Sequence, residues 1–407
     1  MATFTWTGHG KHSGWAARGN WSPGGGPPGA GDLALFDTGI NSAVTGDATV
    51  GGIEFLGAQT VSFAGAITAE GLAGLPYAVT VGLNAQIAFG AGASLTAPSL
   101  EVGVGGGSST LTMAGAALTT TRAVIGGDKV SQGVVSIDHA EWSDAKSLVI
   151  GSMGFGALSL GAGADVFVGV GGTVPGNVEI GVHRGADGSL DLNGGAYMYI
   201  TGNMAIGGAL GAASHGVGQV NVGPNSVLDA LSGTITVNDG SSVGLATGYF
   251  NAGLLNVAQG ALIEGSGRII ASSLLQNNGE IRASGFLDIA GPVQGSGVLE
   301  IGADSALYLE QSVLQQASIS FLGGGGVLGL DESVSVAAPV EGFGVGDSIA
   351  AAFVDNVSWD QSTGILTLMT GDSVDGTLAL TGDFSQDVFK VHEVGSVGTI
   401  TVVAGHI

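Results

Sequence analysis

Residues 148–168 read Leu148-Val-Ile-Gly-Ser-Met-Gly-Phe-Gly-Ala-Leu-Ser-Leu-Gly-Ala-Gly-Ala-Asp-Val-Phe-Val168. This stretch contains three short apolar runs separated by glycine-rich turns. In a strand, successive side chains point to opposite faces, and glycine adopts the positive-φ corners that tight turns require. We therefore expect three short strands in about 25 residues, the size of one coil of a parallel β-solenoid.

The same pattern recurs along the chain. Five apolar segments end in Gly103, Gly126, Gly151, Gly181 and Gly207, at spacings of 23, 25, 30 and 26 residues. The inward-facing Leu, Val and Ile residues of one coil would stack on the equivalent residues of the next coil. The sequence therefore predicts an all-β fold, a mainly right-handed parallel β-solenoid.

Two terminal regions differ from the repeats. Residues 1–44 contain three of the five tryptophans, and residues 331–407 contain eleven acidic residues and one basic residue, Lys390. The end coils of a solenoid need caps, because they otherwise expose apolar core and open strand edges. We expect a Trp-rich N-terminal cap over 1–44, solenoid repeats over 45–330 and an acidic, β-rich C-terminal region over 331–407.

Composition excludes several classes of protein. The 407 residues include 78 glycines and no cysteine, and nine basic against 33 acidic residues give a formal charge of −24. Few helix-favouring charged residues and many glycines argue against a helical bundle. The negative charge opposes nucleic-acid binding, and the absence of cysteine removes disulfides and thiolate chemistry.

The sequence also predicts where the protein is found. The N-terminus lacks the basic start and apolar run of a cleavable secretion signal. The uncharged stretch 71–100 contains Pro76, Pro98 and repeated glycines, so we do not expect it to form a membrane-spanning helix. We expect an extracellular or surface-associated protein exported without a cleavable N-terminal signal and without a transmembrane segment.

Three regions resemble known bacterial families. Thr5-Trp-Thr7, Gly19-Asn-Trp-Ser22 and Pro27-Pro-Gly-Ala-Gly-Asp32 resemble the start of autotransporter-associated β-strand-repeat proteins, and the glycine-rich repeats resemble their passenger domains. Val340-Glu-Gly-Phe343 and Gly346-Asp-Ser-Ile349 resemble the C-terminal region of glycine-rich proteins exported by type I secretion. The resemblance implies an exported bacterial surface or matrix protein with an uncleaved C-terminal secretion signal.

A structural role is the function that the sequence favours. The chain shows no catalytic motif, and we expect no catalytic or cofactor-binding residues. A stiff, sparsely charged solenoid suits a surface or matrix filament subunit, an adhesin or a surface-layer component. Its expected partners are further copies of itself, through docking of coil ends, and cell-surface polysaccharide.

Two other functions use specific residues. Some parallel β-helices are polysaccharide lyases or hydrolases, which need clustered carboxylates. The densest polar cluster here comprises Asp138, His139, Glu141, Trp142, Asp144 and Lys146, and its alternative interpretation is a polar loop leaving one coil. A carbohydrate-binding surface without turnover would use the aromatic rings of Trp142, Tyr197 and Tyr199. The two tyrosines lie two residues apart and should stack on one strand face.

A calcium site is a further possibility that the sequence raises, and it would use oxygen ligands. Carboxylates and loop carbonyls suit Ca²⁺, and the acidic C-terminal region provides candidates; otherwise these form a solvated acidic face. The candidate ligands are Asp347, Asp355, Asp360, Asp372 and Asp375. His9 and His12 form a weaker candidate pair, with a polar cap loop as the alternative. We expect no other cofactor.

Overall fold

A computed structural model describes residues 1–212, 216–314, 318–332 and 334–404. The chain forms two compact units, Met1–Ala230 and Leu231–Ile407. The described residues are almost all strands and turns, with one short 3-10 helix, η1 (Arg18–Asn20). The coils of the two units together make about 14 turns, and the predicted all-β parallel β-solenoid is confirmed.

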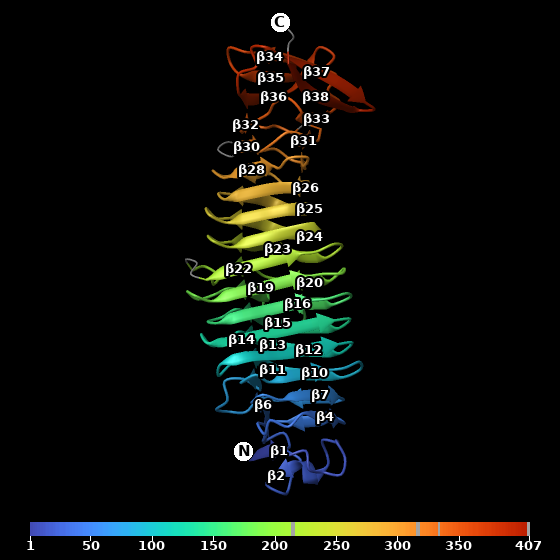
Figure 1. Cartoon of the computed structure of the whole chain (residues 1–407), viewed down its shortest axis with the longest axis vertical. Helices are drawn as coiled ribbons and strands as arrows, with labels where there is room; N and C mark the ends of the chain where they lie inside the picture. Colours follow the sequence, from blue (N-terminus) through green and yellow to red (C-terminus); the bar gives the residue numbers. More distant parts are fainter. Residues whose placement is uncertain (213–215, 315–317, 333, 405–407) are drawn as a thin grey trace. The chain divides into compact units, whose positions relative to one another are not determined.

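Unit 1 is a stack of mostly parallel strands, in which β2 runs antiparallel to β1 (Figure 1). Its strands are β1 (Thr3–Trp6), β2 (Trp21–Ser22), β3 (Leu33–Phe36), β4 (Ser42–Thr45), β5 (Ala48–Val50), β6 (Gly52–Leu56), β7 (Thr60–Ala64), β8 (Ala66–Ala69), β9 (Val79–Gly82), β10 (Gln86–Phe89), β11 (Ser94–Val102), β12 (Gly107–Ala114), β13 (Ala117–Ile125), β14 (Ser131–Asp138), β15 (Glu141–Ile150), β16 (Phe155–Leu160), β17 (Asp165–Val168), β18 (Asn177–Ile180), β19 (Asp187–Leu192), β20 (Tyr197–Ile200), β21 (Met204–Ile206) and β22 (Val217–Val222). β23 (Val227–Val237) spans the boundary at residue 230.

The core of unit 1 consists of apolar ladders that run from coil to coil. β12, β14, β16, β19 and β22 pair in parallel, and this register aligns Leu111, Val135, Leu158, Leu190 and Val220. All five side chains are buried. Each coil therefore buries its apolar face against its neighbours, at about 25 cal/mol per Å² of apolar surface removed from water.

Glycine forms the corners as the repeat predicts. Gly103, Gly126, Gly151, Gly181 and Gly207 all have positive φ, between 65° and 87°. At Gly126 the chain also passes close to the next coil, because an added Cβ would lie 2.4 Å from the Phe155 carbonyl oxygen. Gly103, Gly126, Gly151 and Gly181 all combine a left-handed backbone with a close approach, and only glycine meets both requirements.

An aromatic cluster covers the first coils of unit 1. Trp6, Trp15 and Trp21 are almost fully buried and lie within 6.2 Å, centroid to centroid, of the Phe36 ring. Phe36 in turn stacks on Phe55 at 5.0 Å. The Trp-rich segment thus continues the internal apolar ladder and shields its first strands from water.

Unit 2 begins with the same parallel construction. Its strands are β24 (Ser242–Val257), β25 (Leu262–Asn277), β26 (Glu280–Ala290), β27 (Val293–Gln294), β28 (Val298–Ile301), β29 (Ala306–Leu309), β30 (Ser318–Phe321), β31 (Val327–Leu330), β32 (Pro339–Glu341), β33 (Ser348–Ala352), β34 (Asn356–Asp360), β35 (Ile365–Thr370), β36 (Ser373–Thr381), β37 (Asp387–Val394) and β38 (Val397–Ala404). One buried ladder aligns Ile281, Leu299, Ile319 and Val340.

The last strands of unit 2 change direction. β38 pairs antiparallel with both β33 and β37, and β35 pairs antiparallel with both β34 and β36. The predicted β-rich character of the C-terminal region is therefore correct. Antiparallel strands need only short hairpin connections, which suits a segment that no longer has the coil repeat.

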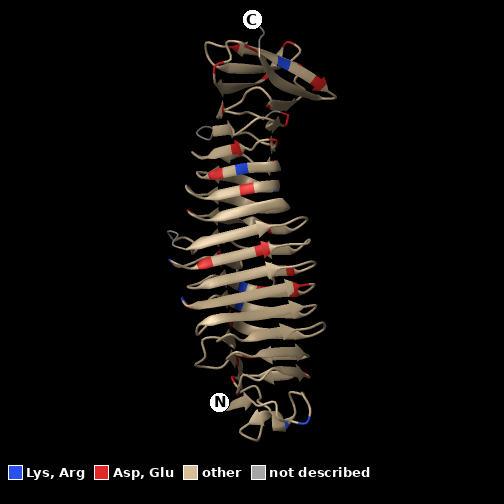
Figure 2. Cartoon of the chain, viewed as in Figure 1, with Lys and Arg blue, Asp and Glu red and all other residues tan. Residues whose placement is uncertain are grey.

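The coils carry few charges (Figure 2). Outward strand positions are occupied mostly by Ser, Thr, Asn and small apolar residues, with charged side chains scattered along both units. No helix in the described part of the chain is long and apolar enough to cross a membrane.

Candidate functional site

The strongest candidate site in unit 1 is an outward sheet face on β15, β17, β20 and the start of β23. The register places Glu141 beside Asp165, and Asp165 beside Tyr197. In the next outward row, Phe167 lies beside Tyr199, and Tyr199 lies beside Asp229. We call these six residues the aromatic face. Strand alternation brings them together, because every second residue of each strand points away from the core.

Three aromatic rings of this face are in contact. Tyr197 and Tyr199 are nearly parallel, with centroids 6.5 Å apart and an interplanar angle of 9°. Phe167 meets Tyr197 edge-on at 6.1 Å. The predicted stacking of the two tyrosines is confirmed, and Phe167 adds a ring from the preceding coil.

Carboxylates border the rings. The Tyr197 hydroxyl donates a 3.4 Å hydrogen bond to Asp229 Oδ2. Partial burial, followed by the charge of Asp229, raises the pKa of Tyr197, so the phenol stays protonated at neutral pH. Glu141 and Asp165 are exposed. The face therefore combines apolar ring surfaces with hydrogen-bond acceptors, and it contains no basic side chain.

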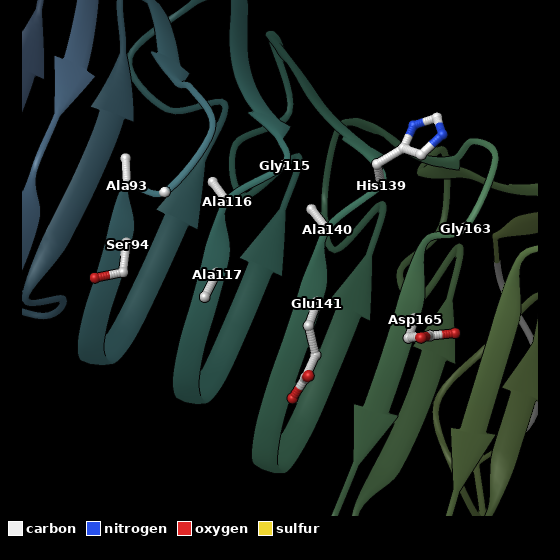
Figure 3. Close-up of a pocket in the computed structure, with 11 residues that line it drawn as sticks. Ala93, Ser94, Gly115, Ala116, Ala117, His139, Ala140, Glu141, Gly163 and Asp165 are labelled. Carbon is white, nitrogen blue, oxygen red and sulfur yellow. The ribbon is translucent and has the colours of Figure 1, made fainter.

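A shallow groove of about 430 Å³ adjoins this face (Figure 3). Small residues on successive turns line it, among them Ala93, Ala116 and Ala140, and its polar members include His139, Glu141 and Asp165. Figure 3 shows the Glu141 and Asp165 carboxylates on neighbouring strands, with the His139 ring on the turn before β15. His139 Nδ1 lies 3.1 Å from Asp138 Oδ2.

The predicted role of Trp142 as a sugar platform is wrong. Its indole is 0% exposed in the core of unit 1, and Nε1 donates a 3.0 Å hydrogen bond to Thr120 Oγ1. Residues 141–150 form a strand, β15, not a polar loop. Strand alternation turns Glu141 outward and Trp142 inward, so the ring cannot stack on a ligand in solution.

The same alternation divides the predicted carboxylate cluster. Asp144 is buried, and its carboxylate accepts hydrogen bonds from the Thr120 hydroxyl at 2.6 Å and from the backbone N–H groups of Lys146 and Ser147. Burial raises its pKa despite these bonds. Asp144 thus lies at the register shift between β13 and β15 and bonds the backbone there. Of the predicted carboxylates, Asp138 and Glu141 remain accessible to a ligand, together with Asp165, which the sequence prediction omitted.

Four of the five calcium candidates accept local hydrogen bonds with their carboxylates. Buried Asp347 accepts bonds from the backbone N–H groups of Gly326 and Gly344, both at 3.0 Å. Asp355 accepts from Gly371 N–H, and Asp375 from the Thr370 hydroxyl. Asp360 accepts from Ser362 and Thr363, while Asp372 lies in the turn between β35 and β36.

Within the described ranges, no three Asp, Glu, His or Cys side chains group closely enough to hold a metal ion. His9 and His12 are exposed in the loop after β1. Calcium binding stays a prediction.

Phe167 and Asp229 were missed by the sequence prediction. The signal that could have found them is the alternation of Asp165-Val-Phe-Val168 aligned against Tyr197-Met-Tyr-Ile200. The coils differ in length because the spacing of the repeat varies. The sequence alone therefore does not fix the register between coils, and the residues of neighbouring coils that lie beside Tyr197 and Tyr199 could not be assigned.

The stacked coils define a β-solenoid protein with a partly exposed aromatic and acidic face. Residues 231–407, which coincide with unit 2, match the family model described as Hyphally regulated cell wall protein N-terminal. No curated protein sequence matches the chain. The inferred membership of a bacterial autotransporter-like group with a type I secretion region is therefore wrong, because the matching family is a fungal cell-wall family.

A cell-wall family and a β-solenoid fold both fit a secreted surface or structural protein, with an extracellular or cell-surface location. A cell-wall family also favours a non-enzymatic role.

Proposed function

We propose that the chain is a structural protein of the cell surface that holds neutral polysaccharide on the aromatic face of unit 1. The observation that carries the proposal is the arrangement of Phe167, Tyr197 and Tyr199, three half-buried rings in contact on an outward sheet face. Aromatic rings present a flat apolar surface, which suits the apolar face of a pyranose ring.

Charge selects the kind of polysaccharide. Glu141, Asp165 and Asp229 accept hydrogen bonds from sugar hydroxyls, and they repel uronate or sulfate groups over the short range of screened Coulomb forces. The formal charge of −24 acts in the same direction. A neutral hexopyranose polymer is therefore the favoured ligand.

Two measurements test this function. Antibody labelling of intact native cells should show the protein at the surface, and labelling only after permeabilisation would contradict the assignment. The purified chain should be retained on an insoluble neutral glucan or chitin, and Tyr197→Ala/Tyr199→Ala should reduce retention several-fold. Phe155→Ala, which removes another exposed ring from unit 1, should leave retention unchanged.

Hydrolysis of polysaccharide is the second candidate. Glu141 and Asp165 are in-register neighbours on parallel strands, where backbones lie about 4.8 Å apart. Retaining glycosidases need two carboxyl groups ~5–5.5 Å apart. A reducing-sugar assay on neutral glucans tests this candidate. If the chain releases reducing ends and either Glu141→Gln or Asp165→Asn abolishes this activity, catalysis at this face is established. If the chain releases no reducing ends, hydrolysis is excluded and binding is the function that is left.

We also propose that the protein associates with further copies of itself. Solenoid coils extend readily by adding strands at open edges. In unit 1 the Trp-rich segment shields the first strands, so association through that edge would require the segment to move. Electron microscopy and light scattering over a range of protein and calcium concentrations test assembly. Filaments would support it, and monomers under all conditions would contradict it.

A further inference from the structure

Unit 2 carries an exposed aromatic pair of its own, on β26 and β29. Phe286 and Tyr308 stack with centroids 6.5 Å apart and an interplanar angle of 24°. Phe286 is 59% exposed. Gly329 occupies the strand position next to Tyr308, and a Cβ there would lie 2.4 Å from Tyr308 Cδ2. The glycine thus leaves room for the tyrosine ring to lie flat over the next coil.

Polar groups of the same outward row border these rings. The register aligns Arg268, Asp288 and Tyr308 on consecutive coils. Arg268 Nη1 lies 3.3 Å from Asp288 Oδ2, and Arg268 Nη2 donates a 2.7 Å hydrogen bond to Glu310 Oε1. The guanidinium is therefore held in position by two carboxylates from different coils.

This cluster retains unused hydrogen-bonding capacity. Asp288 is only 8% exposed, and its Oδ1 has no hydrogen-bond partner among the described residues. The Nε of Arg268 is likewise buried without a partner in that part of the chain. A buried polar atom without a partner costs free energy. Because neighbouring groups cover both atoms, a ligand hydroxyl would reach them only if the surrounding side chains shift on binding.

Charge again decides between ligand classes. The negative charges of Glu310 and Asp331 act on Asp288, and Arg268 is the basic residue whose charge opposes them there. Burial, followed by the charge of Glu310, raises the pKa of Asp288 to about 6, so its carboxyl is largely ionised at neutral pH. The cluster then carries more negative than positive charge and disfavours anionic polymers, while hydroxyl groups can both accept from Arg268 and donate to Asp288.

We propose that Phe286, Tyr308, Arg268 and Asp288 form a second binding site for a neutral hexopyranose polymer. The ligand class rests on the proposed function, but the site uses none of the residues of the aromatic face in unit 1. The chain would then hold two sugar segments, one on each unit.

Titration calorimetry on the full chain tests this site. Laminarihexaose, cellohexaose and chitohexaose serve as neutral probes, and hexagalacturonate as the anionic probe. At least one neutral probe should bind with two sites per chain, and Tyr197→Ala/Tyr199→Ala should reduce this to one. Adding Phe286→Ala should weaken the remaining site at least tenfold. Phe353→Ala is the matched control, because Phe353 is a 51% exposed phenylalanine of the same unit.

Asp288→Asn provides a second, nearly isosteric probe. Asp288→Asn should weaken binding several-fold. It should also reduce the change of affinity between pH 5 and 7, because the asparagine does not titrate. An unchanged thermal midpoint would show that unit 2 of the variant is still folded. If Tyr197→Ala/Tyr199→Ala abolishes all binding, the second site is wrong and the proposed function stands. If only Phe286→Ala abolishes binding, the second site stands and the aromatic face of unit 1 is not the ligand site. Tighter binding of hexagalacturonate, or no neutral binding by the full chain, overturns both.

Discussion

Thr120 and Asp144 form a buried hydrogen bond between adjacent coils of unit 1. The Thr120 hydroxyl donates to Asp144 Oδ2 at 2.6 Å and accepts from Trp142 Nε1 at 3.0 Å. One hydroxyl therefore satisfies both a buried carboxylate and a buried indole. Since an unpaired buried polar group is costly, this threonine should matter far more to stability than its size suggests.

Thr120→Val should accordingly destabilise the protein by about 2–4 kcal/mol. The substitution keeps the side-chain volume almost constant but leaves the buried Asp144 carboxylate and the buried Trp142 indole without this hydrogen-bond partner. Chemical denaturation followed by tryptophan fluorescence measures the change. Thr119→Val is the matched control, since Thr119 is the exposed neighbour on β13. If Thr120→Val lost no more free energy of unfolding than Thr119→Val, the role given to Thr120 would be contradicted.

Glu101 should make stability depend on pH. Its side chain is buried on β11, and burial followed by the charge of Asp128 raises its pKa to about 7, against a smaller opposing effect of Arg122. The folded protein therefore binds this proton more tightly than the unfolded chain does. The stabilisation is complete below the unfolded pKa of about 4.3 and is lost as pH rises to about 7.

Glu101→Gln should remove this dependence. At pH 8 the variant should be more stable than the wild type by about 3–4 kcal/mol, because no buried charge forms. At pH 4 the two proteins should unfold at the same denaturant concentration. Denaturation curves at both pH values measure the difference, and an equal gain at pH 4 and pH 8 would show that the carboxyl does not titrate as argued.

Two glycine substitutions should distinguish the free-energy cost of a left-handed backbone from the cost of a close contact between coils. Gly171 has φ +76° and open space where a Cβ would lie, whereas Gly126 has φ +74° and the Phe155 carbonyl oxygen at 2.4 Å. Gly171→Ala should cost about 1 kcal/mol for the left-handed backbone. Gly126→Ala should cost about 1–3 kcal/mol beyond that, because the neighbouring coil must move. Equal losses in the two variants would mean that coil contact does not require glycine at position 126.

The aromatic cap should be a local source of stability. Trp21 is buried, meets Trp6 at 5.0 Å and Trp15 at 4.7 Å, and donates its indole N–H to the Trp15 carbonyl oxygen. Trp21→Ala should destabilise the N-terminal coils by about 3–5 kcal/mol. Hydrogen exchange should rise in β1, β3 and β6 but much less in β16 and β19, since coils contact only their neighbours. A uniform rise along unit 1 would show that the unit unfolds as one cooperative block.

The repeat made the architecture predictable. Gly126 and Gly151 mark corners in the sequence because no other residue meets their backbone requirement, and alternating runs such as Gly156-Ala-Leu-Ser-Leu160 show which residues point inward. The candidate site was only partly predictable. Tyr197 and Tyr199 lie on one strand, so their stacking follows from alternation alone, but the position of Trp142 depended on which face of β15 turns inward.

Sequence alone determined that the chain is all-β, that it coils in units of about 25 residues, and that its charge disfavours nucleic acids. These properties follow from local periodicity and composition. Tertiary structure decided which residues meet across coils. Phe167 reaches Tyr197, and Arg268 reaches Asp288 and Glu310, only through the register of parallel strands whose connecting turns differ in length. A shift of one residue would turn every one of these side chains to the opposite face, so the sites exist only at the register that the stacked core selects.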